Sequence, residues 1–136
     1  MKEVWNWIQV LVAAIGGFFG WFFGGFDGFL YALLVFVIVD YITGVMCAIA
    51  DKKLSSEVGF KGISKKVMIF ICVAFAAAIQ TQMSLPVRDL TIWFFIANEG
   101  ISLLENVSAF VPVPEKLKEV LSQLRDKTSV FKDKEE

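Results

Sequence analysis

Long apolar runs, separated by short polar stretches, set the pattern of this chain. We read four such runs: Val4–Phe26, Phe29–Ala50, Val67–Ile79 and Leu90–Val111. A helix needs roughly 20 mostly apolar residues to cross a bilayer, and the first, second and fourth runs reach that length. The third run spans only if its helix takes in polar residues at both ends, with lysine stems reaching toward the headgroups. A buried or re-entrant segment is the alternative for it.

This pattern predicts an all-α membrane protein with four transmembrane helices; three transmembrane helices, without the third run, are the alternative. In this prediction residues 1–111 form the transmembrane helical domain. Residues 112–136 form a short amphipathic C-terminal helix and a charged tail on the cytoplasmic side. Gly25 and Gly28 permit a tight turn around Asp27, so the first two runs are expected to form a helical hairpin.

The amphipathic character of the C-terminal segment comes from one apolar stripe. Pro112 and Pro114 end the last apolar run, and Pro114 suits the first turn of a new helix. Apolar residues then recur at i, i+3, i+4 and i+7, giving the stripe Leu117, Val120, Leu121 and Leu124. We expect this stripe to be an association surface, covered by the membrane surface, by the protein itself or by a second subunit.

The basic residues are placed unevenly along the chain, which has 13 lysines and arginines and 14 aspartates and glutamates. With four spans, every basic residue except Arg88 falls on the side of both termini, and the positive-inside rule makes that side cytoplasmic. The loop 51–66 lies on this side, and a helix cap is expected at Ser55 or Ser56. Its lysines form a basic membrane anchor: Lys52, Lys53, Lys61, Lys65 and Lys66.

One aspartate interrupts the second apolar run, in the stretch FVIVDYITGV. A charge at the centre of a membrane helix costs about 2.5–3.5 kcal/mol, so Asp40 needs water, a cation or a hydrogen-bond donor. Thr43 and Gly44 follow at i+3 and i+4 and give Asp40 a small, polar helix face. Gly44 on this face permits the close approach of another helix.

The fourth run carries a wider polar arc, formed by Asn98, Glu99, Ser102, Glu105 and Asn106. Its opposite side, which includes Ile92 and Ile96, is expected to face lipid. Because no lysine or arginine lies inside the apolar runs, complete burial of all the carboxylates is not expected. We interpret the polar residues of both runs as lining a subunit interface or an aqueous lumen; structural polar groups bonded to one another are the alternative.

Glycines repeat at every fourth position near the end of the first run, at Gly16, Gly20 and Gly24. This small-xxx-small pattern lets two membrane helices touch backbone to backbone. The pattern therefore predicts a helix-packing face, within one subunit or between subunits.

The residue types exclude most catalytic chemistry. The chain has no histidine, which removes the usual general base, the commonest metal ligand and triads of the Ser-His-Asp type. Cys47 and Cys72 lie inside apolar runs without metal-ligand spacing. We expect no enzyme activity, no metal site, no cofactor and no nucleic-acid partner. The expected partners are the lipid bilayer and further copies of this chain.

Four segments in this order resemble the toxin-secretion / phage-lysis holin family: DYITGV at Asp40–Val45, KKLSSEVGFKGISKK at Lys52–Lys66, NEGISLLENV at Asn98–Val107 and the tail at Pro112–Leu121. The resemblance implies a small phage-encoded protein of the bacterial cytoplasmic membrane that oligomerises and opens holes. An endolysin, which is a cell-wall hydrolase, or a toxin then leaves the cytoplasm as cargo without specific binding.

Two other functions compete with this reading. A small ion or proton-coupled channel or transporter would use Asp40 and Glu99 as relay or coordinating groups. The sequence shows no selectivity filter and no inverted repeat in support of it. An accessory membrane anchor for another enzyme is the third class.

Overall fold

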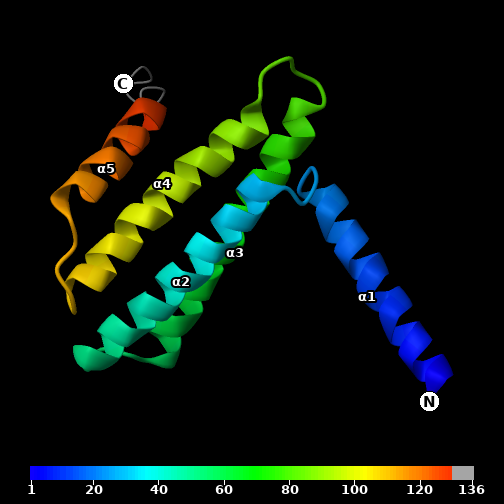
Figure 1. Ribbon diagram of the computed structural model, residues 1–136, viewed down its shortest axis with the longest axis horizontal. Helices are drawn as coiled ribbons and strands as arrows, with labels where there is room; N and C mark the ends of the chain where they lie inside the picture. The colour runs from blue at the N-terminus through cyan, green and yellow to red at the C-terminus, as the bar shows by residue number, and fades with distance from the viewer. Residues whose placement is uncertain (130–136) are drawn as a thin grey trace.

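The structure is a computed structural model that describes residues 1–129, and these form five α-helices without a strand. The helices are α1 (Lys2–Phe22), α2 (Gly28–Ala50), α3 (Ser56–Gln80), α4 (Val87–Ser108) and α5 (Glu115–Ser129) (Figure 1). The predictions of an all-α protein and of a short C-terminal helix are confirmed. The charged tail at 130–136 lies outside the described residues.

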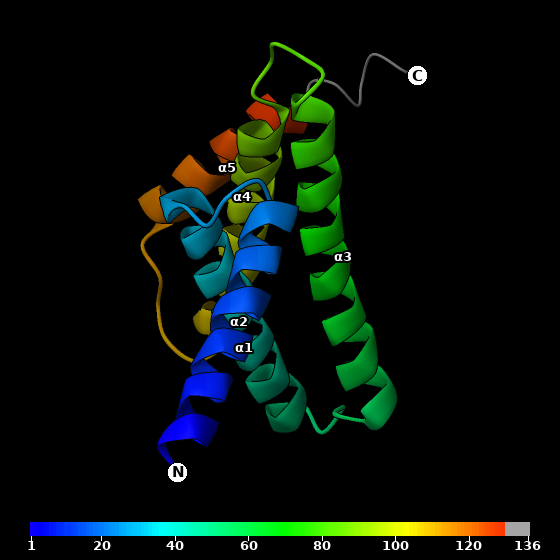
Figure 2. The same cartoon turned by 90° about the vertical axis from the view of Figure 1, so that its right-hand side faces the viewer.

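Helix α4 is the centre of the fold. It packs against α2 and α3 on one side and against α5 on the other (Figure 1, Figure 2). Leu33, Val73 and Ile92, from α2, α3 and α4, form the core and are each 0% exposed. Ile92 and Ile96 are both buried in the bundle, so the prediction that these two residues face lipid was wrong. That prediction failed because α4 packs against three helices, α2, α3 and α5, and not against one.

Three helices, α1, α2 and α3, are long and apolar enough to cross a membrane in the part of the chain that the structure describes. Helix α2 has 23 residues and rises about 34 Å, close to the roughly 30 Å of a bilayer's hydrocarbon core. Helix α4 is not among these three, and it contains Arg88, Asp89, Glu99 and Glu105. It nevertheless lies beside α2 and α3 and runs along the same length of the bundle (Figure 1). A fourth crossing stays a prediction.

Helix α3 is longer than the third apolar run. It begins at Ser56, and the Oγ of Ser55 accepts a hydrogen bond of 3.2 Å from the backbone N–H of Val58. This confirms the predicted cap and adds about three turns before Val67. The prediction of a loop over residues 51–66 was therefore wrong from Ser56 onward, and the lysines at 61, 65 and 66 belong to α3.

The connection between α1 and α2 is a sharp elbow at residues 23–27. Gly24 and Gly25 adopt positive φ values of 80° and 110°, and Asp27 caps α2 by accepting from the N–H of Leu30 at 3.0 Å. The predicted tight turn is present, but α1 then leaves the bundle and packs along no other described helix (Figure 1). The predicted helical hairpin is therefore wrong. Gly24 also lies beyond the end of α1, so it does not extend the glycine face of that helix.

Substitution by alanine is expected to have opposite effects on stability at two glycines of the same repeat, Gly24 and Gly16. A Cβ at Gly24 would lie 2.9 Å from the Cδ of Arg88, and its positive φ disfavours any L side chain. We expect Gly24→Ala to lower the free energy of unfolding by about 1–2 kcal/mol. Gly16→Ala is the matched control, because nothing lies within 4 Å of its Cβ. It should raise the stability of α1 by about 0.5–1 kcal/mol. Thermal unfolding in detergent checks both, and equal effects would contradict the elbow geometry.

Candidate functional site

Three charged side chains from three helices meet inside the bundle. The Nζ of Lys66 on α3 donates to Asp40 Oδ2 on α2 at 2.5 Å and to Glu99 Oε2 on α4 at 2.5 Å. Asp40 is 5% exposed and Glu99 is 7% exposed. We call Asp40, Lys66 and Glu99 the ion cluster. With two carboxylates and one ammonium, it carries a formal charge of -1 when all three groups are ionised.

Polar neighbours complete the shell around Asp40. The Nδ2 of Asn106 donates to Asp40 Oδ1 at 3.1 Å and lies 3.2 Å from the Oγ1 of Thr43. Thr43 in turn donates to the carbonyl of Val39, one turn earlier, at 2.9 Å. The approach of α4 to α2 is close here, because a Cβ on Gly44 would lie 3.6 Å from Asn106 Nδ2. With Asn106 bound to Oδ1 and Lys66 bound to Oδ2, each carboxylate oxygen of Asp40 has a hydrogen-bond donor.

The ion cluster lies deep along the helices that hold it. Lys66 is ten residues after the first residue of α3, which places it about 15 Å into that helix. Asp40 is twelve residues into α2, about 18 Å from its start. Both positions are near mid-depth of a helix that spans a bilayer. An ion pair at this depth is retained only when each charge keeps its partner.

Sequence reasoning missed the cation of this cluster. It expected no basic side chain beside the carboxylates, and it placed Lys66 in the loop 51–66 or at the headgroup end of the third span. Both expectations were wrong, because Lys66 lies inside the bundle and pairs with both carboxylates. The signal was present in the cap at Ser55, since a helix that starts there carries Lys66 well into the bundle. Lys65, the next residue back along the helix, is exposed.

The structure brings only part of the predicted polar set together. Asp40, Thr43, Glu99 and Asn106 belong to the network around the ion cluster. Ser102 lines a crevice of about 250 Å³ that leads from the cluster past Tyr41 and Lys65. Asn98 is half-buried and Glu105 is exposed, and neither has a hydrogen bond within this network. Glu105 instead lines a smaller crevice with Lys118 of α5.

A second ionic cluster joins the elbow to the other end of the bundle. Arg88, at the start of α4, is 3% exposed. It donates from Nη1 to Asp27 Oδ2 at 2.8 Å, from Nε to the Phe23 carbonyl at 2.6 Å and from Nη2 to the Gly25 carbonyl at 2.7 Å. Its backbone N–H donates to Gln80 Oε1, at the end of α3, at 2.9 Å. Arg88 thereby ties α2, α3 and α4 together at the elbow.

The charge state of Asp27 reflects this contact. Side-chain hydrogen bonds from Arg88 lower the pKa of the Asp27 carboxyl below its usual value of 3.8, and the N–H of Leu30 acts in the same direction. Partial burial opposes them. Because the folded pKa lies below the unfolded one, this contact stabilises the fold at neutral pH. That stabilisation is lost as the pH falls through the folded pKa.

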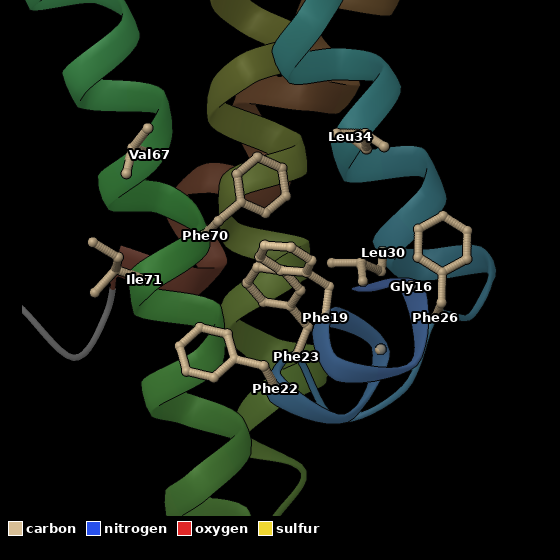
Figure 3. A pocket seen from close by; sticks show the side chains of 11 residues that line it. Gly16, Phe19, Phe22, Phe23, Phe26, Leu30, Leu34, Val67, Phe70 and Ile71 are labelled. Atoms are coloured by element: carbon tan, nitrogen blue, oxygen red, sulfur yellow. The ribbon is translucent and has the colours of Figure 1, made fainter. Parts of the chain in front are cut away.

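An apolar groove of about 750 Å³ lies where α1 leaves the bundle (Figure 3). Phenylalanines at its base point toward one another, and the rings of Phe23 and Phe70 meet edge to face at 5.8 Å (Figure 3). Gly16 and Gly20 line the α1 wall, and nothing lies within 4 Å of a Cβ at either position. Within residues 1–129 the glycine face therefore packs against no other helix, and packing between subunits stays a prediction.

The apolar stripe of α5 is only partly covered. Leu121 packs on Gly100 of α4, whereas Leu117 is 47% exposed and Val120 is 49% exposed. The side chain of Leu124 lies outside the described part of the chain. The protein's own α4 thus covers a portion of the stripe, and the remainder is available to another partner.

Comparison with known proteins gives consistent matches. The chain matches the bacteriophage holin family over residues 17–126. An uncharacterized 14.9 kDa protein of Clostridium perfringens is 40% identical over 131 residues, covering 93% of this chain and 99% of the relative. An uncharacterized protein of Listeria monocytogenes is 40% identical over 115 residues, or 83% of this chain and 80% of the relative. A probable holin of Bacillus phage phi105 is 41% identical over 78 residues, or 56% of this chain and 58% of the relative. No solved structure matches the chain.

An all-helical chain with three apolar helices of spanning length is a membrane protein. Since the family match extends over most of its residues, the chain belongs to the bacteriophage holin family.

The ion cluster predicts a large loss of stability when its cation is removed. Lys66→Met leaves two carboxylates side by side at mid-depth without a cation, so we expect the free energy of unfolding to fall by about 3–5 kcal/mol. Adding Asp40→Asn and Glu99→Gln to Lys66→Met should restore most of the loss, because no buried charge is then left. Lys65→Met is the control and should have little effect. Denaturant unfolding in detergent measures all three, and a neutral Lys66→Met would contradict the pairing.

The second cluster predicts a pH-dependent contribution of Asp27. Asp27→Asn keeps a residue that can cap α2 but removes the charge that Arg88 binds. With half of the Asp27 side chain exposed, we expect a loss of about 1 kcal/mol at neutral pH. The difference from the unchanged protein should shrink as the pH falls below the folded pKa of Asp27. Thermal unfolding over a pH series tests this, and a constant difference would rule out the charge as the cause.

Proposed function

We propose that this protein acts as a holin: it oligomerises in the bacterial cytoplasmic membrane and forms holes through which an endolysin or a toxin leaves the cytoplasm. The family match over residues 17–126 carries this proposal. In it, both termini lie in the cytoplasm, α4 completes a fourth crossing, and the cargo passes without a specific binding site. The role requires no catalysis.

The ion cluster supports a mechanism in which subunits exchange internal contacts for water. In a single subunit, Lys66 pairs both carboxylates inside the bundle. Charged groups are solvated better by water than by a protein interior, so a water-filled rim would stabilise the open arrangement. A hole forms in this scheme when enough subunits associate to hydrate their clusters together. A threshold concentration is expected in this scheme because a single subunit cannot form a water-filled rim by itself.

The surfaces that would hold such an assembly are the parts left unpaired within one chain. Helix α1 has no buried residue, although it is apolar along its length. Apolar surface of this extent is covered in a membrane by lipid or by other helices. Gly16 and Gly20 of α1 permit a close helix contact there, which favours a second copy of this chain as the neighbour.

A small ion or proton-coupled channel is the second candidate. The crevice of about 250 Å³ beside Asp40 and Lys66 favours it, because it gives a path from the surface to buried charges. A channel would carry a steady and selective current at low expression. A holin would leave the membrane intact until a threshold is reached.

Induced expression in a bacterial host separates these functions. We expect a delay, then abrupt loss of the membrane potential, with lysis only when an endolysin is expressed with the protein. Asp40→Asn and Glu99→Gln should shift the delay, because each changes the charge of the ion cluster. Glu105→Gln is the matched control, since Glu105 is an exposed carboxylate on the same helix as Glu99. A steady current without a threshold would support the channel, and no effect on the membrane would exclude both functions.

A further inference from the structure

Helix α5 has a surface pattern that its contact with α4 does not use in full. At about 100° per residue, Leu117, Val120 and Leu121 lie within one apolar stripe. Lys116 and Lys118 border this stripe, each about 100° from Leu117 on opposite sides. The helix therefore presents an apolar centre with a lysine along each edge.

The acidic residues of the first turns occupy the opposite face. Glu115 and Glu119 lie about 160° from the direction of Leu117, on either side of the far face, and both are exposed. An apolar stripe with basic edges and an acidic back is the arrangement of a helix that lies in the plane of a membrane surface. Lysine stems at the edges cover apolar surface while their ammonium groups reach the headgroups.

The contact with α4 uses one edge of this stripe and the polar side next to it. The Cδ atoms of Leu121 lie 3.2 and 3.3 Å from where a Cβ on Gly100 would be, so that leucine is seated against α4. Lys118 and Ser122 face the crevice beside Glu105. Leu117 and Val120, at the middle and far edge of the stripe, remain about half exposed. The contact is thus rotated toward a polar edge and leaves apolar surface uncovered.

The position of α5 beside α4 also conflicts with a bilayer. Helix α5 doubles back along α4, whose other side packs on the spanning helices α2 and α3 (Figure 1). In a membrane this places the charges of Lys116, Glu119 and their neighbours against acyl chains. Charged side chains are strongly disfavoured there.

We propose that α5 has a second docking site, the anionic headgroup surface of the bilayer, and that it occupies this site when the protein is in a membrane. The apolar stripe is then buried among the headgroups and upper acyl chains, and Lys116 and Lys118 lie beside lipid phosphates. Glu115 and Glu119 face water. Residues 109–114, which link α4 to α5, allow the rotation because they form no helix. This inference goes beyond hole formation and holds whether or not holes form.

The test follows one label on each face of α5 in the full-length protein. Cys47→Ala and Cys72→Ala remove the native thiols, and a fluorophore is attached at Val120→Cys or, as the matched control, at Glu119→Cys. The protein is reconstituted in vesicles of phosphatidylglycerol and phosphatidylcholine, with brominated acyl chains as quencher. We expect quenching of the label at 120 and not at 119. Equal quenching at both positions, or none at 120, would overturn the proposal.

A second experiment varies the charge of α5 and the lipid composition of the vesicles. Lys116→Gln with Lys118→Gln should shift the balance from docked to undocked α5 by on the order of 25-fold, since each basic residue near an anionic surface contributes about fivefold. Vesicles of phosphatidylcholine alone should weaken docking of the unchanged helix in the same way. Quenching that is independent of both charge and lipid would refute an electrostatic surface site.

A disulfide reports whether α5 stays on α4. Gly100→Cys with Leu121→Cys, in the same thiol-free background, should form a bond in detergent, because Leu121 contacts position 100 in the structure and no bilayer surface competes for α5 there. In anionic vesicles the yield should fall several-fold. An undiminished yield would show that α5 remains on α4. Efficient bonding of Val120→Cys between subunits in every lipid would assign the stripe to a second copy instead, and would also overturn the proposal.

Discussion

The fold depends on one ammonium group placed between two carboxylates inside a bundle of apolar helices. Because Lys66 binds Asp40 and Glu99 together, α2, α3 and α4 have one relative depth and rotation at which all three charges are paired. A slip of one residue turns a helix by about 100° and leaves a buried charge alone. Apolar packing in a membrane lacks this discrimination, since lipid chains resemble the helix surfaces they would replace. The ion cluster therefore sets helix register as well as charge balance.

Arg88 sets the other fixed point, and the two clusters together divide the molecule into a registered centre and two arms. Helices α2, α3 and α4 are joined at mid-depth by Lys66 and at the elbow by Arg88. Helix α1 leaves this centre through a pair of positive-φ glycines, and α5 lies on its outside. The centre holds both buried ionic clusters, whereas α1 has no buried residue and the apolar stripe of α5 is only partly covered. Both arms therefore carry apolar surface that no contact within the described residues covers.

The sequence predicted the helical class, the turn at Asp27, the cap at Ser55 and the polar character of Asp40 and Glu99, because each depends on local pattern. It did not predict the partner of Asp40, because the contact with Lys66 joins residues 26 apart and depends on where α3 begins. It also assigned a lipid-facing side to α4. Apolar periodicity reports which residues avoid water, but in a membrane chain both lipid and protein satisfy that preference. The direction of α1 was missed for the same reason.

The distance along the chain between Asp27 and Arg88 bears on how the protein is built. These residues are 61 positions apart, so the elbow leaves the ribosome well before the arginine that binds it. Before Arg88 is synthesised, the carbonyls of Phe23 and Gly25 lack the guanidinium group that they bind in the folded chain. The direction in which α1 leaves the bundle therefore depends on a residue that follows α1, α2 and α3 in the chain. The elbow can take its final form only once the start of α4 is in place.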